Sequence, residues 1–218
     1  MTGCVASVRP GVVRRLALDP PAVRVETILR LARYRDLARV PRAIREAAVK
    51  VAAEASRLAA PEVALWRGPV TSRDPAGAVT LADQHRFHSA VLARVLGPCP
   101  EAVVFVLTAG PAIEQRAQSM LADKLLLEAF LMDTAAWVAI EQLVRGVRQQ
   151  LIAEERPAGG VVTHRLAPGY CDWPLEEQME LFAVFGEHPL PVTLNEAACM
   201  LPCKSVSGVF GIVPAVHG

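Results

Sequence analysis

One stretch of the chain gathers side chains that could hold a small molecule, the run HRLAPGYCDWPLEEQMELF at residues 164–182. Pro168 and Gly169 force a turn, and such turns expose backbone amides and carbonyls that can pair with the edge of a planar heterocycle. Arg165 stands just before the turn, where its guanidinium can grip a carboxylate through two parallel charge-assisted hydrogen bonds. The run therefore predicts recognition of a heterocycle and a carboxylate in one place.

The residues after the turn offer two further kinds of contact. Tyr170 presents a ring face and a hydroxyl, and Asp172 can take an ammonium group. A nucleotide that carries an amino acid would use all of these groups together. In the structural alternative, Arg165 pairs with a local carboxylate while Tyr170 and Trp173 anchor the helix that follows. Local chemistry alone leaves both interpretations open.

The histidine-containing run DQHRFH, residues 83–88, resembles the Asp-x-His-x-x-Gly pattern with which cobalamin-binding modules present a histidine to cobalt. Its sixth position is His88 instead of glycine, and the serine and paired-glycine segments of such modules do not follow. His85 and His88 could share a helix face as metal ligands, but no third ligand is evident. We expect Asp83 to cap an ordinary, solvent-facing helix here.

The cysteines are weaker candidates for a metal site or a catalytic nucleophile. Cys199 and Cys203 supply only two of the four ligands of a structural zinc site, so we expect them to be buried, reduced thiols. Cys171 is a conceivable nucleophile, but the carboxylate of the adjacent Asp172 would raise the thiol pKa instead of lowering it. The sequence contains no phosphate-binding glycine loop, no G-x-G-x-x-G and no G-x-S-x-G nucleophile turn.

The elements that position these residues follow from hydrophobic periodicity and from Pro and Gly punctuation. Because strands and helices do not alternate strictly, the pattern predicts an α+β fold, with an antiparallel mixed sheet flanked by helices. We expect residues 1–60 to form an arm and helices that pack on a main α+β domain of residues 61–218. The expected irregular arm covers residues 1–22, the expected helices cover 23–35, 41–58, 83–96, 111–154 with a break near 122–123, and 174–186, and the expected strands cover 62–70, 76–82, 101–110, 160–167, 192–200 and 205–214.

Composition narrows the class of protein. The 218 residues carry a net charge of +1, which gives no electrostatic case for binding nucleic acid or an anionic membrane. No apolar run reaches the roughly 18–20 residues of a membrane span, and we find no secretory signal. Five scattered cysteines are typical of reduced thiols. These observations predict a cytoplasmic protein.

Two ordered blocks, RLAPGYCDWPLEEQMELF and VTLNEAACMLPCKSVSGVFGI, together resemble the activation (reactivation) domain of cobalamin-dependent methionine synthase, in particular its short stand-alone form. The family pattern is R-x-x-P-G-Y, then D-W-P-L and a helix with Gln, and finally M-x-P-x-K-S-V-S-G. The matching positions are Arg165, Pro168, Gly169, Tyr170, Asp172, Trp173, Pro174, Gln178, Met200, Pro202, Lys204, Ser205, Ser207 and Gly208.

The resemblance implies a ligand and partners. In that family the domain binds S-adenosylmethionine beside an inactive cob(II)alamin, and a flavodoxin-like donor supplies an electron. By analogy, Arg165 holds the ligand carboxylate, the backbone of residues 167–169 meets the adenine, and Tyr170 lines the pocket. The residues implied in binding are Arg165, Ala167, Pro168, Gly169, Tyr170, Asp172, Ser207, Gly208 and Phe210.

Three features depart from the family pattern. The acidic residue that the full-length enzymes place near their domain start has no counterpart before Asp36. Phe210 stands where the full-length enzymes place an aromatic hydroxyl, and Cys171 stands where stand-alone relatives tend to have glycine. The first hypothesis is a reactivation subunit that acts in trans on a separate cobalamin-binding methionine synthase. The second is a non-catalytic docking module that grips a corrinoid protein and no longer binds S-adenosylmethionine. The third is an enzyme that depends on Cys171.

Overall fold

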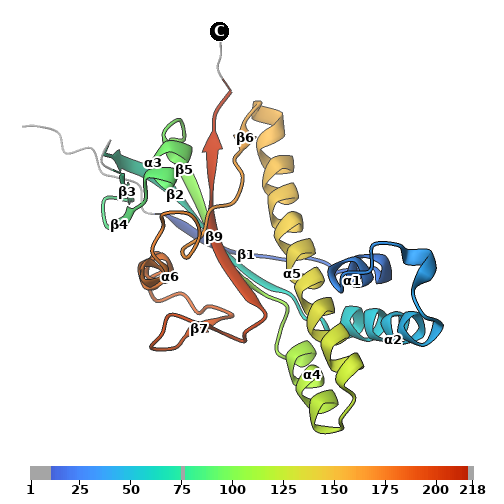
Figure 1. The fold of residues 1–218 in the computed structure, drawn as a ribbon. Helices are drawn as coiled ribbons and strands as arrows, with labels where there is room; N and C mark the ends of the chain where they lie inside the picture. The colour runs from blue at the N-terminus through green and yellow to red at the C-terminus, as the bar shows by residue number, and fades with distance from the viewer. Residues whose placement is uncertain (1–10, 75–76, 216–218) are drawn as a thin grey trace, which may run out of the picture.

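A twisted antiparallel sheet forms the centre of the protein (Figure 1), and helices flank it. The computed structural model describes residues 11–74 and 77–215. Within them the main sheet has seven strands in the order β4-β3-β2-β5-β9-β6, with β1 paired to β2. The predicted α+β class with an antiparallel sheet is thus confirmed. The strands are β1 (Val12–Leu16), β2 (Glu62–Arg73), β3 (Ala78–Leu81), β4 (His85–His88), β5 (Glu101–Thr108), β6 (Val161–Val162) and β9 (Ser205–Val213).

The three central strands β2, β5 and β9 are buried on both faces. Because successive side chains of a strand point to opposite faces, alternate residues of one strand enter two different cores. Phe105 of β5 joins the core beneath the long helices. Its neighbours Val104 and Val106 join the core on the opposite face. This explains why the sequence of β5 is continuously apolar instead of alternating.

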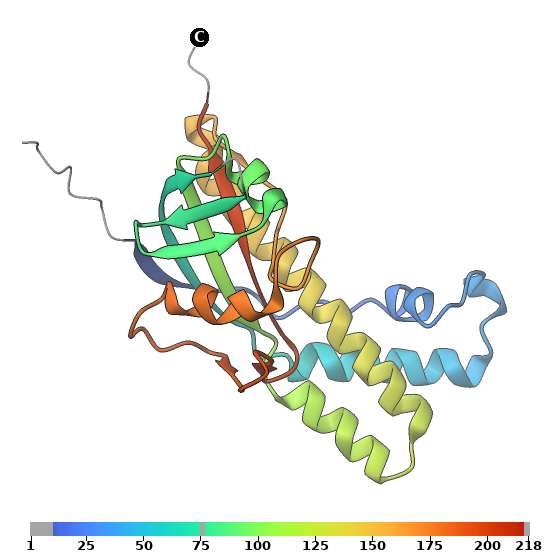
Figure 2. The ribbon, with the colours of Figure 1, turned by 60° about the vertical axis from the view of Figure 1, so that its left-hand side comes forward.

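The helices form two groups around the sheet. The first is α1 (Val25–Leu31), α2 (Arg42–Leu58), α4 (Ala112–Ala122) and α5 (Leu126–Glu155), and the second is α3 (Ala90–Leu96) and α6 (Gln178–Ala183). Figure 2 shows α5 running along the sheet and extending beyond it to meet α1, α2 and α4. The expected break in the long helical region is confirmed, because Lys124 adopts a left-handed φ of 60° between α4 and α5.

The helices α1 and α2 contact the rest of the described chain through apolar side chains. Ile28 of α1 and Val51 and Ala55 of α2 belong to the same core as Phe105 and Val144. Apolar contacts therefore join α1 and α2 to the sheet and to α5. The boundary at residue 60 stays a prediction.

One expectation that proved wrong is the irregular arm. Residues 1–10 lie outside the described residues, but β1 pairs antiparallel with β2 from Val12↔Arg67 to Leu16↔Val63. The run VVRRL lacks the regular alternation of a half-buried strand because it lies at a sheet edge. Its polar members make surface ion pairs, such as Arg14 with Glu154 at 2.5 Å.

The helix expected from Asp83 to residue 96 was also wrong. Ala82 and Asp83 both have positive φ, 50° and 61°, and form the turn of the β3–β4 hairpin. The helix α3 begins only at Ala90, and the Ser89 side chain accepts the capping hydrogen bond from the amide of Leu92. The apolar residue Phe87 is buried by strand alternation and not by a helical stripe.

Three further segments are shorter or more divided than expected. Only β6 and the single bridge Leu166↔Val209 remain of the strand at 160–167. The segment 192–200 forms a hairpin of β7 (Thr193–Leu194) and β8 (Met200–Leu201), because the Asn195 side chain accepts hydrogen bonds from the amides of Ala197 and Cys199 and closes a turn. The helix at 174–186 begins as a 3-10 turn, η3 (Leu175–Glu177), before α6.

Candidate functional site

A pocket of about 480 Å³ lies where the turn at residues 165–170 meets α5, α6, the β7–β8 hairpin and β9. Six of the nine residues implied in ligand binding line this pocket. They are Arg165, Ala167, Pro168, Gly169, Tyr170 and Ser207. The two sequence blocks, which are separated along the chain, therefore meet at one cavity.

Arg165 carries the clearest signal for a ligand. Its Nη1 atom is buried and has no hydrogen-bond partner, and its guanidinium carbon lies 5.7 Å from the centroid of the Tyr170 ring. Among the described residues it forms no ion pair, so the local carboxylate of the structural alternative is not present. A buried charged donor without a partner is costly, and a bound carboxylate would relieve that cost.

The turn itself is closed by its own backbone. The amide of Gly169 donates to the carbonyl of Trp173 at 2.9 Å, and the amide of Tyr170 donates to the carbonyl of Ala167 at 3.3 Å. Gly169 adopts φ +83°, a conformation that favours glycine. Within the described chain the amide of Ala167 and the carbonyls of Pro168 and Gly169 make no hydrogen bond. One donor and two acceptors are thus left to meet a heterocycle.

At the floor of the pocket, two buried hydrogen bonds link Ser207, Gln178 and Ala198 into a polar relay. The Ser207 hydroxyl on β9 donates to Gln178 Oε1 of α6 at 3.1 Å, and Gln178 Nε2 donates to the carbonyl of Ala198 in the hairpin at 3.1 Å. Both side chains are almost fully buried. Gln178 matched the family pattern but was not among the implied binding residues. A polar residue on the buried face of a helix was the signal for it.

The other three implied residues lie outside the pocket lining. Asp172 turns away and caps α3, with its carboxylate accepting from Ser89 Oγ at 2.5 Å and from the amide of Ala90 at 2.6 Å. The hydrogen bond from Ser89 is the main reason that the pKa of the Asp172 carboxyl is lowered. The expected ammonium contact therefore has no support from the position of this side chain.

Gly208 and Phe210 lie behind the pocket on β9. A Cβ atom at Gly208 would stand 2.6 Å from the carbonyl oxygen of Leu166, so glycine allows the strand to approach the Arg165 segment closely. Phe210 is fully buried and stacks on Phe105 with ring centroids 5.2 Å apart. The missing hydroxyl at Phe210 thus removes no polar group from the pocket.

Sequence reasoning did not single out the wall that α5 contributes. Trp137 lines the pocket, and so do Ile140 and Glu141, which lie one helical turn after it. Glu141 is the carboxylate in the lining. Lys204 lies with its Nζ 5.6 Å from the centroid of the Trp137 ring and 2.6 Å from Asp133 Oδ1. A tryptophan within the predicted long helix was the available sequence signal.

His85 and His88 each pair with a carboxylate of the α6 segment. His85 Nδ1 lies 2.7 Å from Glu180 Oε1, and His88 Nδ1 lies 2.8 Å from Glu177 Oε1. Both histidines lie on the strand β4 and not on the expected helix. In the ranges 11–74 and 77–215, no three or more His, Cys, Asp or Glu side chains gather as a metal site would require.

The expectation that Cys199 and Cys203 are buried was wrong, because both are exposed and line the pocket. A hydrogen bond to Glu114 is the largest of the effects that raise the pKa of the Cys203 thiol. Cys171 is exposed but lies outside the pocket lining. Of the described cysteines only Cys99 is buried.

The described helices include none that is both long and apolar enough to cross a membrane.

No known family profile matches the sequence, and no curated protein matches it either. Among solved structures, the chain is similar to a crystal structure of the MetH reactivation domain bound to AdoHcy, with a TM-score of 0.59 and 13% sequence identity. The match covers 97% of this chain and 82% of that one. The chain therefore has the fold of that reactivation domain.

Proposed function

We propose that the chain binds S-adenosylmethionine in the pocket at residues 165–170 and acts in trans as a reactivation subunit for a cobalamin-dependent methionine synthase. The observation that carries the proposal is the buried, unpaired Nη1 of Arg165 beside the turn. The similarity in fold to a reactivation domain crystallised with AdoHcy supports it. This function requires a cytoplasmic cobalamin-binding methionine synthase and a flavodoxin-like reductant as partners.

Each part of the ligand has a candidate group in the pocket. The carboxylate of the methionine moiety pairs with Arg165 through charge-assisted hydrogen bonds. The adenine edge, which has both a donor and an acceptor, pairs with the free amide of Ala167 and the free carbonyls of the turn. Glu141 replaces Asp172 as the partner of the ammonium, because its carboxylate lines the cavity. Tyr170 covers the side of the site through its exposed ring.

The contribution of this chain to the reaction is binding and orientation. When bound, S-adenosylmethionine supplies the methyl group, and the partner supplies the cobalt that accepts it. The fixed turn and the Ser207–Gln178 floor hold the ligand in one orientation, which lowers the entropic cost of bringing the reacting groups together. Tyr170 and Trp137 are more than half exposed at the edge of the pocket. The partner therefore has access to the ligand from that side.

The two rival functions receive less support. The docking module without S-adenosylmethionine is favoured by the missing hydroxyl of Phe210 and by the weak resemblance of the amino-terminal residues to the family. The first of these grounds carries little weight, because the Phe210 ring lies in the core and not in the pocket. The enzyme that depends on Cys171 needs a thiol beside the ligand, and Cys171 lies outside the lining.

Equilibrium titration with S-adenosylmethionine tests the proposal. The wild-type chain should bind saturably, and Arg165→Ala should bind at least tenfold more weakly because the ligand carboxylate loses its counter-ion. The matched control is Arg86→Ala, which removes an exposed arginine from β4, away from the pocket. Absence of saturable binding by the wild type would overturn the proposal. A positive result leads to a second assay, restoration of methylcobalamin on a methionine synthase without its own reactivation domain.

A further inference from the structure

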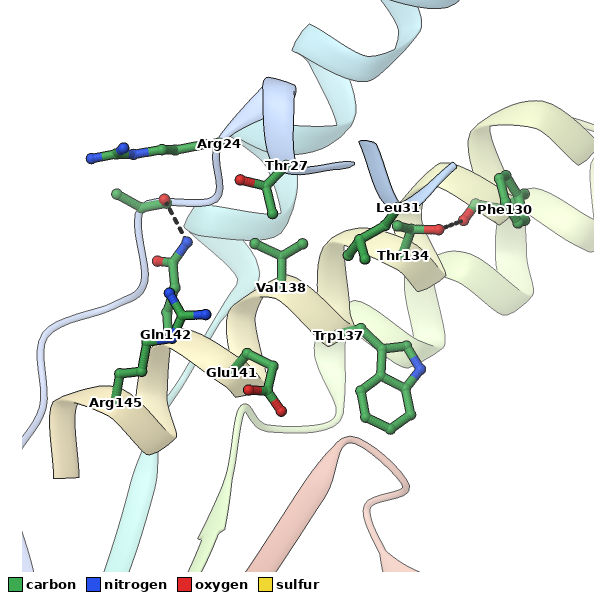
Figure 3. Close-up of a pocket in the computed structure, with 11 residues that line it drawn as sticks. Arg24, Thr27, Leu31, Phe130, Thr134, Trp137, Val138, Glu141, Gln142 and Arg145 are labelled. Carbon is green, nitrogen blue, oxygen red and sulfur yellow. Dashed lines mark hydrogen bonds between the residues drawn. The ribbon is translucent and has the colours of Figure 1, made fainter. Parts of the chain in front are cut away.

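A second, larger groove lies beside the ligand pocket (Figure 3). It has a volume of about 740 Å³ and runs between the α1 segment and the outer face of α5. The hydrogen bond from Gln142 Nε2 to the carbonyl of Ala22, 3.1 Å long, ties its two walls together. Its lining consists of Ala22, Arg24, Thr27, Leu31, Phe130, Thr134, Trp137, Val138, Glu141, Gln142 and Arg145.

Large apolar side chains lie exposed in this groove. Leu31 of α1 is 54% exposed, and Phe130 and Trp137 of α5 are 56% and 54% exposed. A contiguous exposed apolar patch with a polar rim is typical of a protein-binding surface. Aromatic and arginine side chains dominate the energetics of such surfaces.

Two positively charged side chains at the rim of the groove have no partner in the described chain. The side chains of Arg24 and Arg145 make no hydrogen bond and no ion pair with any residue of the described chain, and Figure 3 shows both at the same end of the groove. One wall of the groove, which contains Arg24 and α1, belongs to a basic part of the protein. Residues 1–60 contain twelve Lys and Arg against five Asp and Glu, a net charge of +7, whereas residues 61–218 contain eleven against seventeen, a net charge of −6. An acidic surface is the complementary partner.

The groove adjoins the ligand pocket. Trp137 and Glu141 line both cavities and form the ridge between them. Lys204, itself paired with Asp133, lies over the Trp137 ring and fixes the orientation of this ridge. A protein that occupies the groove is therefore brought directly beside whatever binds in the pocket.

We propose that this groove docks an acidic segment of the cobalamin-carrying partner, with an apolar side chain of that segment on Phe130 and Trp137 and its carboxylates on Arg24 and Arg145. The inference rests on the proposed function, since that function demands a partner at the pocket. Groove contacts hold the partner while the pocket presents the methyl donor. Charge attraction speeds the encounter, and the apolar contacts slow dissociation.

Binding of cob(II)alamin-loaded methionine synthase without its own reactivation domain tests the docking site. The double variant Arg24→Glu/Arg145→Glu should bind this probe at least tenfold more weakly, and Phe130→Ser should also weaken binding. The matched controls are Arg86→Glu/Arg94→Glu, which make the same change in charge on β4 and α3, and Val161→Ser, which removes an exposed apolar side chain from β6. The controls should bind as the wild type does.

Titration of each variant with S-adenosylmethionine separates this inference from the proposed function. We expect unchanged affinity for S-adenosylmethionine in all groove variants, and half-maximal remethylation at a higher concentration of the variant chain with the same maximal rate. If the wild type binds S-adenosylmethionine but groove variants bind the cobalamin protein as tightly as the controls do, the docking inference is overturned and the proposed function stands. It is overturned equally if the wild type binds S-adenosylmethionine but not the cobalamin protein. If the wild type does not bind S-adenosylmethionine, the proposed function is overturned, and the docking inference that rests on it is overturned with it.

Discussion

The guanidinium carbon of Arg165 lies 5.7 Å from the centroid of the Tyr170 ring, so the two side chains form one unit across the turn. Tyr170→Ala should weaken binding of S-adenosylmethionine several-fold, because an exposed cation–π contact contributes about 0.5–1 kcal/mol and the ring also covers the ligand. Tyr170→Phe keeps the ring face and should bind almost as the wild type does. Titration of the three proteins checks this. If Tyr170→Phe is as weak as Tyr170→Ala, the hydroxyl and not the ring face makes the contact.

The substitution Phe210→Tyr, which adds the aromatic hydroxyl that position 210 lacks, should not improve ligand binding. Phe210 is fully buried against Phe105, so the added hydroxyl would lie in the core without a partner. An unpaired buried hydroxyl costs about 1–3 kcal/mol. Chemical denaturation should show that loss of stability, while the affinity for S-adenosylmethionine stays the same. A gain in affinity would mean that position 210 reaches the ligand.

Much of the fold could be predicted because the pattern within each central element is strong. The continuous apolar run of β5 and the stripe of α2 identify these elements from local sequence alone. The hairpin at Ala82 and Asp83 could not be predicted in the same way. Asp83 suits both a helix cap and a left-handed turn, and the choice depends on pairing between β3 and β4.

The residues of the pocket could be predicted where a local turn places them. They could not be predicted where packing between distant segments of the chain places them. The turn with Gly169 lies in the lining as expected. Asp172 follows that turn directly, yet it caps α3, which lies more than eighty residues earlier in the chain. Glu141 and Trp137 enter the pocket only because α5 crosses the sheet beside β9. No spacing rule connects residues so far apart.

The cap that Asp172 provides to α3 should make stability depend on pH. The hydrogen bonds from Ser89 and from the amides of Ala90 and Val91 stabilise the ionised carboxylate, so the folded pKa lies below the unfolded pKa. This contribution is fully present above the unfolded pKa, about 3.9 for aspartate, and is lost as the pH falls through the folded pKa. Asp172→Asn should therefore lower the melting temperature by a few degrees at pH 7.

Denaturation of wild type and Asp172→Asn at pH 7, 5 and 3 measures this effect. The difference in stability should be similar at pH 7 and pH 5 and much smaller at pH 3. Glu176→Gln is the matched control, because it removes an exposed carboxylate of the next turn that has no partner in the described chain. A difference that is as large at pH 3 as at pH 7 would show that the cap does not depend on the ionised carboxylate.

The relay beneath the pocket should couple stability to ligand binding. Gln178→Leu leaves the Ser207 hydroxyl without its acceptor and the Ala198 carbonyl without its donor, both in buried positions. The loss should be about 1–3 kcal/mol in the free energy of unfolding. Because β9 and the hairpin both line the pocket, the affinity for S-adenosylmethionine should fall as well.

A double-mutant cycle with Ser207→Ala isolates the contact between the two side chains. Since the Ser207 hydroxyl donates directly to Gln178, the cost of the double substitution should be smaller than the sum of the single costs by at least about 0.5 kcal/mol. Gln150→Leu on the exposed face of α5 is the matched control and should change stability by less than about 0.5 kcal/mol. Additive costs would mean that Gln178 supports the hairpin through Ala198 alone, and the pocket floor would then consist of two independent parts.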